Sequence, residues 1–418
     1  MKRAAVILGS ALAGALLGGS TMVAIQAADR PATDAATPPR ISAERAATTV
    51  ATPSTRPSPS ATGTAPEATP SVLLAWSRSG AGRGLDPGLE PAAVAFPGVG
   101  ATSLVRAGGL DLVGSRNMEG GRVDALPPGW AIPLDAVAVD PTRQAEFVPV
   151  ADRAAIAGLR PGSAVLGRTS AGLRRLAAGG VIELTGGRSV VVAGVVEDAS
   201  IGGAELAVDV ATGERLGLTT PRYLLIAYRG DRPALEDHLR AALRPGTVVR
   251  FRGPGETPYL RHADAVLPQA QIKARFGEFS YRPGAAGGFE QDPRWRAENI
   301  VTRRVPILGA VRCHRGILDA LVGALTEIER AGLAGLVQQA GYNGCFNPRF
   351  VAGSDSVSRH AWGAAFDMGF GSNPTGLESV QDPRLVEIFR RWGFTSGDSW
   401  LVPDAGHFEF IGVPLARQ

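Results

Sequence analysis

Two short segments near the C-terminal end combine the residue types of a metal centre. His360 and Asp367 lie in the first segment, and His407 follows about forty residues after Asp367 in the second. Two imidazoles and one carboxylate leave a coordination position open for water, which is the donor set of a catalytic zinc site. Asp404, three residues before His407, adds a carboxylate of the kind that serves as a general base. These residues predict a hydrolytic zinc centre, although manganese or cobalt also suit such donors.

The spacing of these residues predicts strands rather than one helix. On a straight helix His360 and Asp367 would lie about 10 Å apart, which is too far for one shared ion. Apolar residues alternate around Asp367 and again through 407–411, which predicts two strands with His407 and Glu409 on one face. Adjacent antiparallel strands, entered from a loop carrying His360, would gather three ligands around one ion. The alternative is a structural pair of His360 and Asp367 with an unrelated histidine at a strand end.

A longer pattern surrounds these candidate ligands. It reads Ser358-x-His360-x-x-Gly363-x-Ala365-x-Asp367, then Trp400, then Asp404-x-x-His407-Phe408-Glu409. Over about residues 270–412 the chain resembles the zinc D-alanyl-D-alanine carboxypeptidase (VanY-like) family of cell-wall peptidases. The segments Cys313-His314-Arg315 and Gly344-Cys345-Phe346-Asn347-Pro348-Arg349 resemble its secreted branch, which carries two such cysteines. The resemblance implies an α+β fold there, with a small antiparallel sheet, packed helices and a zinc ion.

The resemblance assigns roles to the candidate residues. His360, Asp367 and His407 would bind zinc. Asp404 would be the general base, at a position where that family often has glutamate, and Arg349 would hold a substrate carboxylate or stabilise the oxyanion. A surface salt bridge is the alternative for Arg349. The implied substrate is a peptidoglycan stem peptide, cut at its terminal D-Ala or, alternatively, within the stem. The rival class is a non-catalytic zinc module that binds the wall or a protein partner.

Other residues near the two motifs have supporting roles in this interpretation. Ser358 is expected to hold its loop or to contact substrate, and Trp400 to line the cleft or to lie in the core. Glu409 is expected to orient a ligand histidine from behind. His314 is expected to be structural rather than an additional ligand.

The N-terminal sequence predicts export. Met1-Lys2-Arg3 precedes an uncharged apolar stretch over residues 4–28, which is typical of an export signal that is either cleaved or kept as a membrane anchor. Both outcomes place the rest of the chain outside the cytoplasm, where Cys313 and Cys345 are expected to form a disulfide rather than remain free thiols. A net charge of +4, with no Lys/Arg run longer than a pair, argues against nucleic-acid binding and fits an anionic wall.

The signals divide the chain into four regions. Residues 1–28 are the signal or anchor helix, and residues 29–70 are a disordered stalk rich in Pro, Ala, Thr and Ser. Residues 71–268 are expected to form a mixed α/β domain of unknown function that could bind a membrane or protein partner. Residues 270–418 are expected to form the peptidase-like domain.

Within residues 71–268, local signals predict several elements. Gly186-Gly187 lies between two β-rich runs and predicts a hairpin turn. The apolar run 223–228 predicts a buried strand. Helices are expected over 170–178, with Ser170 as N-cap, and from Pro233 to about residue 243.

The C-terminal region has clear helix signals. Residues 315–331 form an amphipathic pattern that ends at Gly332, and Asp382 and Gly393 bracket a second helix. The segment 305–309, which precedes the first cysteine, predicts a strand.

Overall fold

The structure is a computed structural model, and it describes residues 70–79, 84–256, 267–284, 288–352, 354–369 and 371–412. The expected N-terminal apolar helix and stalk lie outside these residues, apart from Pro70 at the end of the stalk. Within the described part of the chain, no helix is both long enough and apolar enough to cross a membrane. Residues 65–418 belong to one compact unit.

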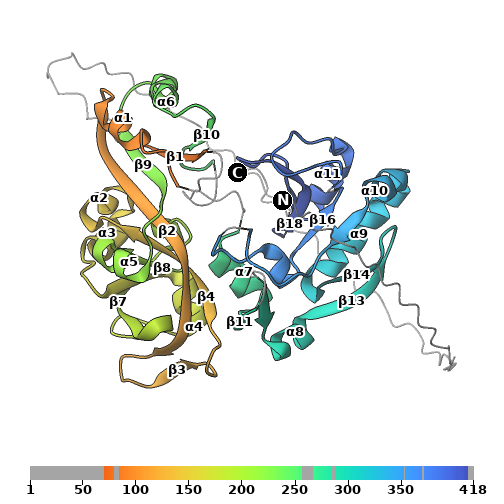
Figure 1. Cartoon of the computed structure of the whole chain (residues 1–418), viewed down its shortest axis with the longest axis horizontal. Coiled ribbons are helices and arrows are strands. Elements are labelled where there is room, and N and C mark those ends of the chain that lie inside the picture. The colour runs from red at the N-terminus through yellow and green to blue at the C-terminus, as the bar shows by residue number, and fades with distance from the viewer. Residues whose placement is uncertain are drawn as a thin grey trace, which may run out of the picture. The chain divides into compact units, whose positions relative to one another are not determined.

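Ten strands form the larger sheet, and the longest of them, β2 (Val99–Arg116), is its spine. Figure 1 shows β2 as the long orange strand. The strand order is β10 (Thr247–Arg252), β1 (Ser71–Ser79), β9 (Pro221–Tyr228), β2, β4 (Ile132–Val139), β8 (Leu206–Asp209), β5 (Ser163–Gly167), β7 (Arg188–Val196) and β6 (Val181–Leu184), with β3 (Arg122–Ala125) paired to β2.

The C-terminal half of β2 takes part in a closed barrel. β6 pairs with β2 as well as with β7, so the path β2-β4-β8-β5-β7-β6 returns to its first strand. Buried apolar side chains fill the interior, including Leu112, Leu134, Leu166 and Val208. Closure removes free edges, which is how such sheets avoid unpaired strands. Helices α2 (Pro141–Gln144) and α3 (Val150–Ala157) lie between β4 and β5, α4 (Arg168–Arg174) lies between β5 and β6, and α5 (Val210–Leu216) leads from β8 to β9.

The N-terminal half of β2 belongs to an open extension of the sheet. Here β2 pairs with β9, β9 with β1, and β1 with β10, all antiparallel. Helices α1 (Leu89–Ala95) and α6 (Arg232–Ala241) pack on one face of this extension (Figure 1). Leu73 and Ala75 of β1 point into that helical layer, whereas Leu74 and Trp76 point to the opposite face. One face of the extension therefore packs against α1 and α6, and the opposite face belongs to a second buried cluster that includes Ile156 of α3.

Most local predictions for this region are confirmed. The hairpin of β6 and β7 turns at Gly186 and Gly187, both with positive φ, and β9 contains the predicted buried strand. The helix at 170–178 was placed wrongly: α4 covers Arg168–Arg174 and its N-cap is Gly167. Ser170 is a buried residue inside α4, and its hydroxyl donates to Glu205, so it has no capping role.

The C-terminal part contains a small antiparallel sheet covered by helices, as predicted. Its order is β15 (Tyr342–Gly344), β16 (Ala365–Met368), β18 (Asp404–Phe410) and β17 (Phe394–Gly397). Helices α7 (Gln269–Phe276), α8 (Pro293–Asn299), α9 (Leu318–Arg330), α10 (Ala334–Ala340) and α11 (Pro383–Arg391) accompany it, as do the hairpins β11 (Tyr281–Pro283)/β12 (Phe289–Gln291) and β13 (Ile300–Val305)/β14 (Gly309–His314). The core between the sheet and α11 is aromatic, with Phe366, Phe389, Phe394 and Phe408 in mutual contact.

Helix boundaries in this part follow their sequence signals, and one predicted strand is wrong. Asp382 caps α11 by accepting a hydrogen bond from the Arg384 backbone N–H, and Gly332, with positive φ, follows α9. The segment 305–309 is not a continuous strand: Val305 ends β13, residues 306–308 form the turn, and Gly309 begins β14. Ile307 has a φ of 61°, a left-handed conformation that an apolar run does not reveal.

The two cysteines form the predicted disulfide. Cys313 at the end of β14 is bonded to Cys345 just after β15, and both are buried. The bond joins residues 32 positions apart and fixes the β13/β14 hairpin to the segment that follows β15.

A buried group of four charges joins α7 to the barrel. Arg174 of α4 contacts Glu278 at 2.7 Å and Glu205 at 3.2 Å, and Lys273 of α7 contacts Glu205 at 2.8 Å. Burial alone would raise the pKa of Glu278, but Lys273 and Arg174 hold it at about 2. Each charge has an opposite partner, which is the condition for burying it at tolerable cost. The arrangement fixes the start of the C-terminal part against the barrel.

Candidate metal centre and its cleft

His360 is positioned by a single tight turn. Ser358 caps the short 3-10 helix η6 (Arg359–Trp362) by accepting a hydrogen bond from the His360 backbone N–H. Gly363 ends this turn with a φ of 61°, and a Cβ there would lie 2.7 Å from the backbone nitrogen of His314. Only glycine fits, so this residue of the sequence pattern serves to direct the chain from His360 into β16.

Asp367 and His407 are brought together by strand register. β16 and β18 are antiparallel, and Asp367 lies directly opposite His407. The neighbouring pair Phe366 and Phe408 stacks on the other face, with ring centroids 5.2 Å apart. Because side chains alternate along a strand, burial of the phenylalanines directs Asp367 and His407 to the opposite face. The predicted strand arrangement is the observed one.

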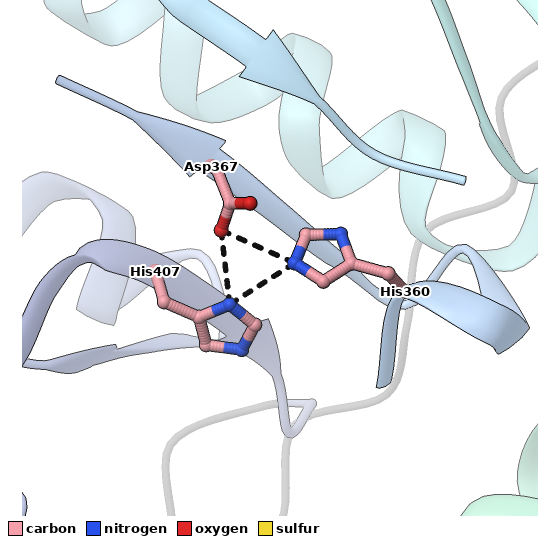
Figure 2. Close-up of side chains that lie close together, drawn as sticks. All are labelled: His360, Asp367 and His407. Carbon is pink, nitrogen blue, oxygen red and sulfur yellow. Dashed lines mark hydrogen bonds and ion pairs between the residues drawn. The ribbon is translucent and has the colours of Figure 1, made fainter. Parts of the chain in front are cut away.

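The three candidate ligands form a compact triangle, shown in Figure 2. His360 Nε2 and His407 Nδ1 lie 3.1 Å and 3.0 Å from Asp367 Oδ1, and the two nitrogens lie 3.1 Å from each other. Tetrahedral zinc with nitrogen or oxygen ligands at its usual bond lengths holds its donors about 3.3 Å apart. One donor atom from each residue thus lies close to the spacing that one such ion requires.

Outer contacts turn both imidazoles toward this triangle. The Nδ1 atom of His360 lies 2.7 Å from the carbonyl oxygen of Cys345, and His407 Nε2 lies 3.3 Å from Glu409 Oε1. With a metal ion bound, the nitrogen facing an oxygen acceptor would donate its hydrogen in each neutral ring, and the nitrogen facing Asp367 would offer its lone pair to the ion. Two donor nitrogens and one carboxylate oxygen are therefore available to a cation.

The electrostatics of the triangle also favour a cation. Burial would raise the pKa of Asp367, but hydrogen bonds from His360 and His407 hold it well below its usual range. Burial would lower the pKa of His407, but Asp367 and Glu409 raise it to about 9. The metal-free site therefore keeps a proton on His407 at neutral pH, which a bound metal ion would replace.

The other predicted site residues meet in one cavity of about 390 Å³ beside the triangle. His407, Asp404, Arg349, Ser358, Trp400 and Glu409 all line it. Asp404 begins β18, and its Oδ1 accepts a hydrogen bond from Thr375 at 3.1 Å. The Trp400 ring lies 5.3 Å from the His407 ring, at the cleft rather than in the core.

His314 is structural, as predicted. Its Nε2 lies 3.1 Å from the carbonyl oxygen of Phe276, and its Nδ1 accepts a hydrogen bond from the Gly316 backbone N–H. Burial lowers the pKa of His314 to about 4, which keeps the ring neutral. Both nitrogens are engaged within the protein, so His314 has no donor atom for a metal ion.

The sequence interpretation missed residues that reach the cavity from the larger sheet and from a neighbouring loop. Thr375, Trp76, Arg78 and Asp355 line it. One signal could have indicated this approach: two consecutive glycines, Gly108-Gly109, lie inside the long strand β2, and glycine within a strand often marks close contact with another backbone.

One of three comparisons with known proteins matches the segment that contains the site. The sequence model of a family described as D-alanyl-D-alanine carboxypeptidase matches residues 352–410, which include the triangle and Asp404. A search of the curated proteins found no match. Among solved structures, the periplasmic region of MacB from Actinobacillus actinomycetemcomitans matches with a TM-score of 0.30 and 9% identity, over 43% of this chain and 88% of that one.

The family match covers the segment in which the turn, the strand pairing and the three candidate ligands occur together. Within the C-terminal third of the chain, residues 352–410 thus match the D-alanyl-D-alanine carboxypeptidase (VanY-like) family that the sequence pattern resembles.

Proposed function

We propose that the chain is a zinc-dependent peptidase that hydrolyses peptidoglycan stem peptides by removing the terminal D-alanine. The observation that carries this proposal is the triangle of His360, Asp367 and His407 with Asp404 in the same cavity, inside the segment that matches the peptidase family. A binding module without catalysis would need neither a carboxylate base nor an arginine beside its metal.

The residues of the chain have distinct tasks in this proposal. A zinc ion bound by His360, Asp367 and His407 would act as a Lewis acid that lowers the pKa of a water molecule. Asp404 takes the proton of the attacking water and passes it to the leaving amine. Since Oδ1 of Asp404 accepts a hydrogen bond from Thr375, we assign the proton transfer to Oδ2. Arg349 donates hydrogen bonds to the substrate carboxylate or to the developing oxyanion.

In the same proposal, the cellular location and the binding partners of the protein follow from its N-terminal sequence and its substrate class. We propose an extracytoplasmic protein that meets peptidoglycan, exported by residues 1–28 and held at the membrane if that segment is not cleaved. The disulfide between Cys313 and Cys345 supports an oxidising compartment.

The assigned base is tested by Asp404→Asn. We expect kcat to fall by about 10²- to 10⁴-fold, the usual contribution of a positioned base, while the zinc content stays that of the wild type. Metal analysis and peptide hydrolysis measure the two quantities on one preparation. Asp398→Asn is the matched control, since Asp398 is a nearby carboxylate that is not among the described residues lining the cavity. Full activity of Asp404→Asn would remove Asp404 from the mechanism.

A further inference from the structure

The cavity beside the metal triangle has a second wall, which the larger sheet supplies. Trp76 and Arg78 of β1, Val137 of β4 and Tyr223 of β9 line it from that side. These residues precede the segment that matches the peptidase family by more than a hundred positions. Trp76 and Tyr223 lie on the face of the extension opposite to helices α1 and α6, and they pack with Val137 in a buried cluster that includes Ile156 of α3. This face of the larger sheet forms one side of the candidate catalytic cleft.

A hairpin of the peptidase part is docked on this wall. The described residues of this 349–358 hairpin are 349–352 and 354–358: Phe350 pairs with Val357, and the Ser358 N–H donates to the Arg349 carbonyl. Near its tip, Asp355 Oδ2 accepts a hydrogen bond of 2.6 Å from the Gly109 backbone N–H. A Cβ on Gly109 would lie 2.8 Å from the Asp355 carbonyl oxygen, so the close approach depends on glycine. β2, the strand that contains Gly108 and Gly109, thus contacts the hairpin that carries Arg349.

The opposite side of the cleft is attached to the same sheet. Arg250 of β10 donates a hydrogen bond of 2.8 Å to the carbonyl oxygen of Ser399, the residue before Trp400. Elsewhere, the Tyr281 hydroxyl donates to Asp111 of β2 at 2.6 Å. With the buried charges around Lys273, these contacts make the sheet a fixed part of the cleft.

The chemistry of this wall indicates what it would bind. Trp76 and Arg78 are two positions apart on β1, so their side chains share the face that lines the cavity. Among the described residues, no carboxylate forms an ion pair with Arg78. The Trp76 ring already has the Arg252 guanidinium over it, 6.0 Å from its centroid. A further guanidinium on this wall, that of Arg78, suits a peptide segment with an anionic group, because a guanidinium binds carboxylate through a bidentate fork.

We propose that Trp76 and Arg78 form a subsite for a carboxylate of the substrate peptide away from the bond that is cut. This inference rests on the proposed function for the identity of the peptide. In this proposal the peptidase segment provides the metal ligands and the base. The larger sheet, through Trp76 and Arg78, contributes to substrate specificity.

Two pentapeptides that end in D-Ala-D-Ala test the subsite. One carries a free glutamyl α-carboxylate in its second residue, and its twin carries the amide there. With the purified full chain, we expect kcat/KM to be about tenfold higher for the acid peptide than for the amide peptide. This ratio corresponds to the free energy of one charge-assisted hydrogen bond. Arg78→Ala should bring the ratio close to one, and Arg78→Lys should keep part of it. Arg122→Ala is the control, because Arg122 is exposed on β3 and is not among the residues lining the cavity.

The outcomes separate this inference from the proposed function. Cleavage of both peptides with no preference in the wild type, or a preference that Arg78→Ala keeps, would overturn the subsite and leave the peptidase intact. Failure to cleave either peptide would count against the proposed function. In that case, calorimetry on the wild type and on Arg78→Ala measures how tightly each binds the two uncleaved peptides. The subsite predicts that the wild type binds the acid peptide more tightly than the amide peptide and that Arg78→Ala does not.

Discussion

At the scale of single residues, the histidines are distinguished by what their second nitrogen contacts. His360 and His407 each turn one nitrogen to an oxygen acceptor and the other to Asp367. His314 uses both nitrogens within its own surroundings. The first arrangement leaves a lone pair for a cation and the second leaves none. Residue type and spacing alone could not make this distinction for His314, which follows Cys313 directly.

His314 leads to a prediction about stability and pH. Its pKa is about 4 in the folded protein, against an ordinary value of 6.5. Above pH 6.5 the ring is neutral in both states and costs nothing. As the pH falls from 6.5 toward 4, the unfolded chain takes up a proton that the folded protein does not, so stability is lost. We expect His314→Gln, which can keep both hydrogen bonds, to show a smaller loss than the wild type in urea unfolding between pH 7.5 and pH 4.5.

The matched control for this experiment is His238→Gln, on the exposed side of α6. It removes a histidine without disturbing the core around Phe276. If His314→Gln and the wild type lose stability in parallel over this pH range, burial of a neutral His314 is not what drives the loss.

At the scale of elements, short-range patterns were sufficient to predict that His360, Asp367 and His407 come together. The alternation around Asp367 and after His407 gave the paired strands β16 and β18 and their common face. Where such prediction failed, the reason was local geometry: the left-handed φ of Ile307 turns the chain where an apolar strand was expected. Ser170 has a capping residue's chemistry but lies inside α4, because Gly167 starts that helix.

The docked 349–358 hairpin leads to a prediction about Gly109. We expect Gly109→Val to displace the Asp355 tip, since its Cβ would meet the backbone of Asp355. Movement of the hairpin would shift Arg349 at its base, and misplacement by about 1 Å can cost about 10²-fold in rate. Peptide hydrolysis measures the loss in kcat/KM, and thermal unfolding shows whether the variant is folded.

Gly100→Val is the control in the same strand. A Cβ at Gly100 would meet nothing within 4 Å, so this variant adds the same side chain to β2 in open space. Equal activity of the Gly109 and Gly100 variants would mean that the hairpin does not depend on its contact with the sheet.

At the scale of the whole molecule, the role of the larger sheet could not be predicted. Its strands pair across long distances in sequence, as when β1 lies between β9 and β10. No periodicity within residues 71–252 indicates that one face of the extension will line a cavity with residues from 349–409. The buried ion pairs between Arg174, Glu205, Lys273 and Glu278 are equally hidden, because each charge alone is typical of a surface residue.

The same contacts determine how the protein has to be studied. Removal of residues 71–252 would expose Lys273 and the apolar contacts of Tyr281, and would delete one wall of the cleft. Experiments on activity therefore require the chain with its sheet, rather than the C-terminal third alone.

The most direct test of the central claim is mass spectrometry of peptidoglycan stem peptides incubated with the purified chain, once with zinc and once after treatment with a chelator. The account predicts loss of one terminal D-alanine, abolished by the chelator and restored by zinc. A cut within the stem would identify the endopeptidase alternative. No cleavage by folded protein that contains zinc would contradict the account and favour a binding module.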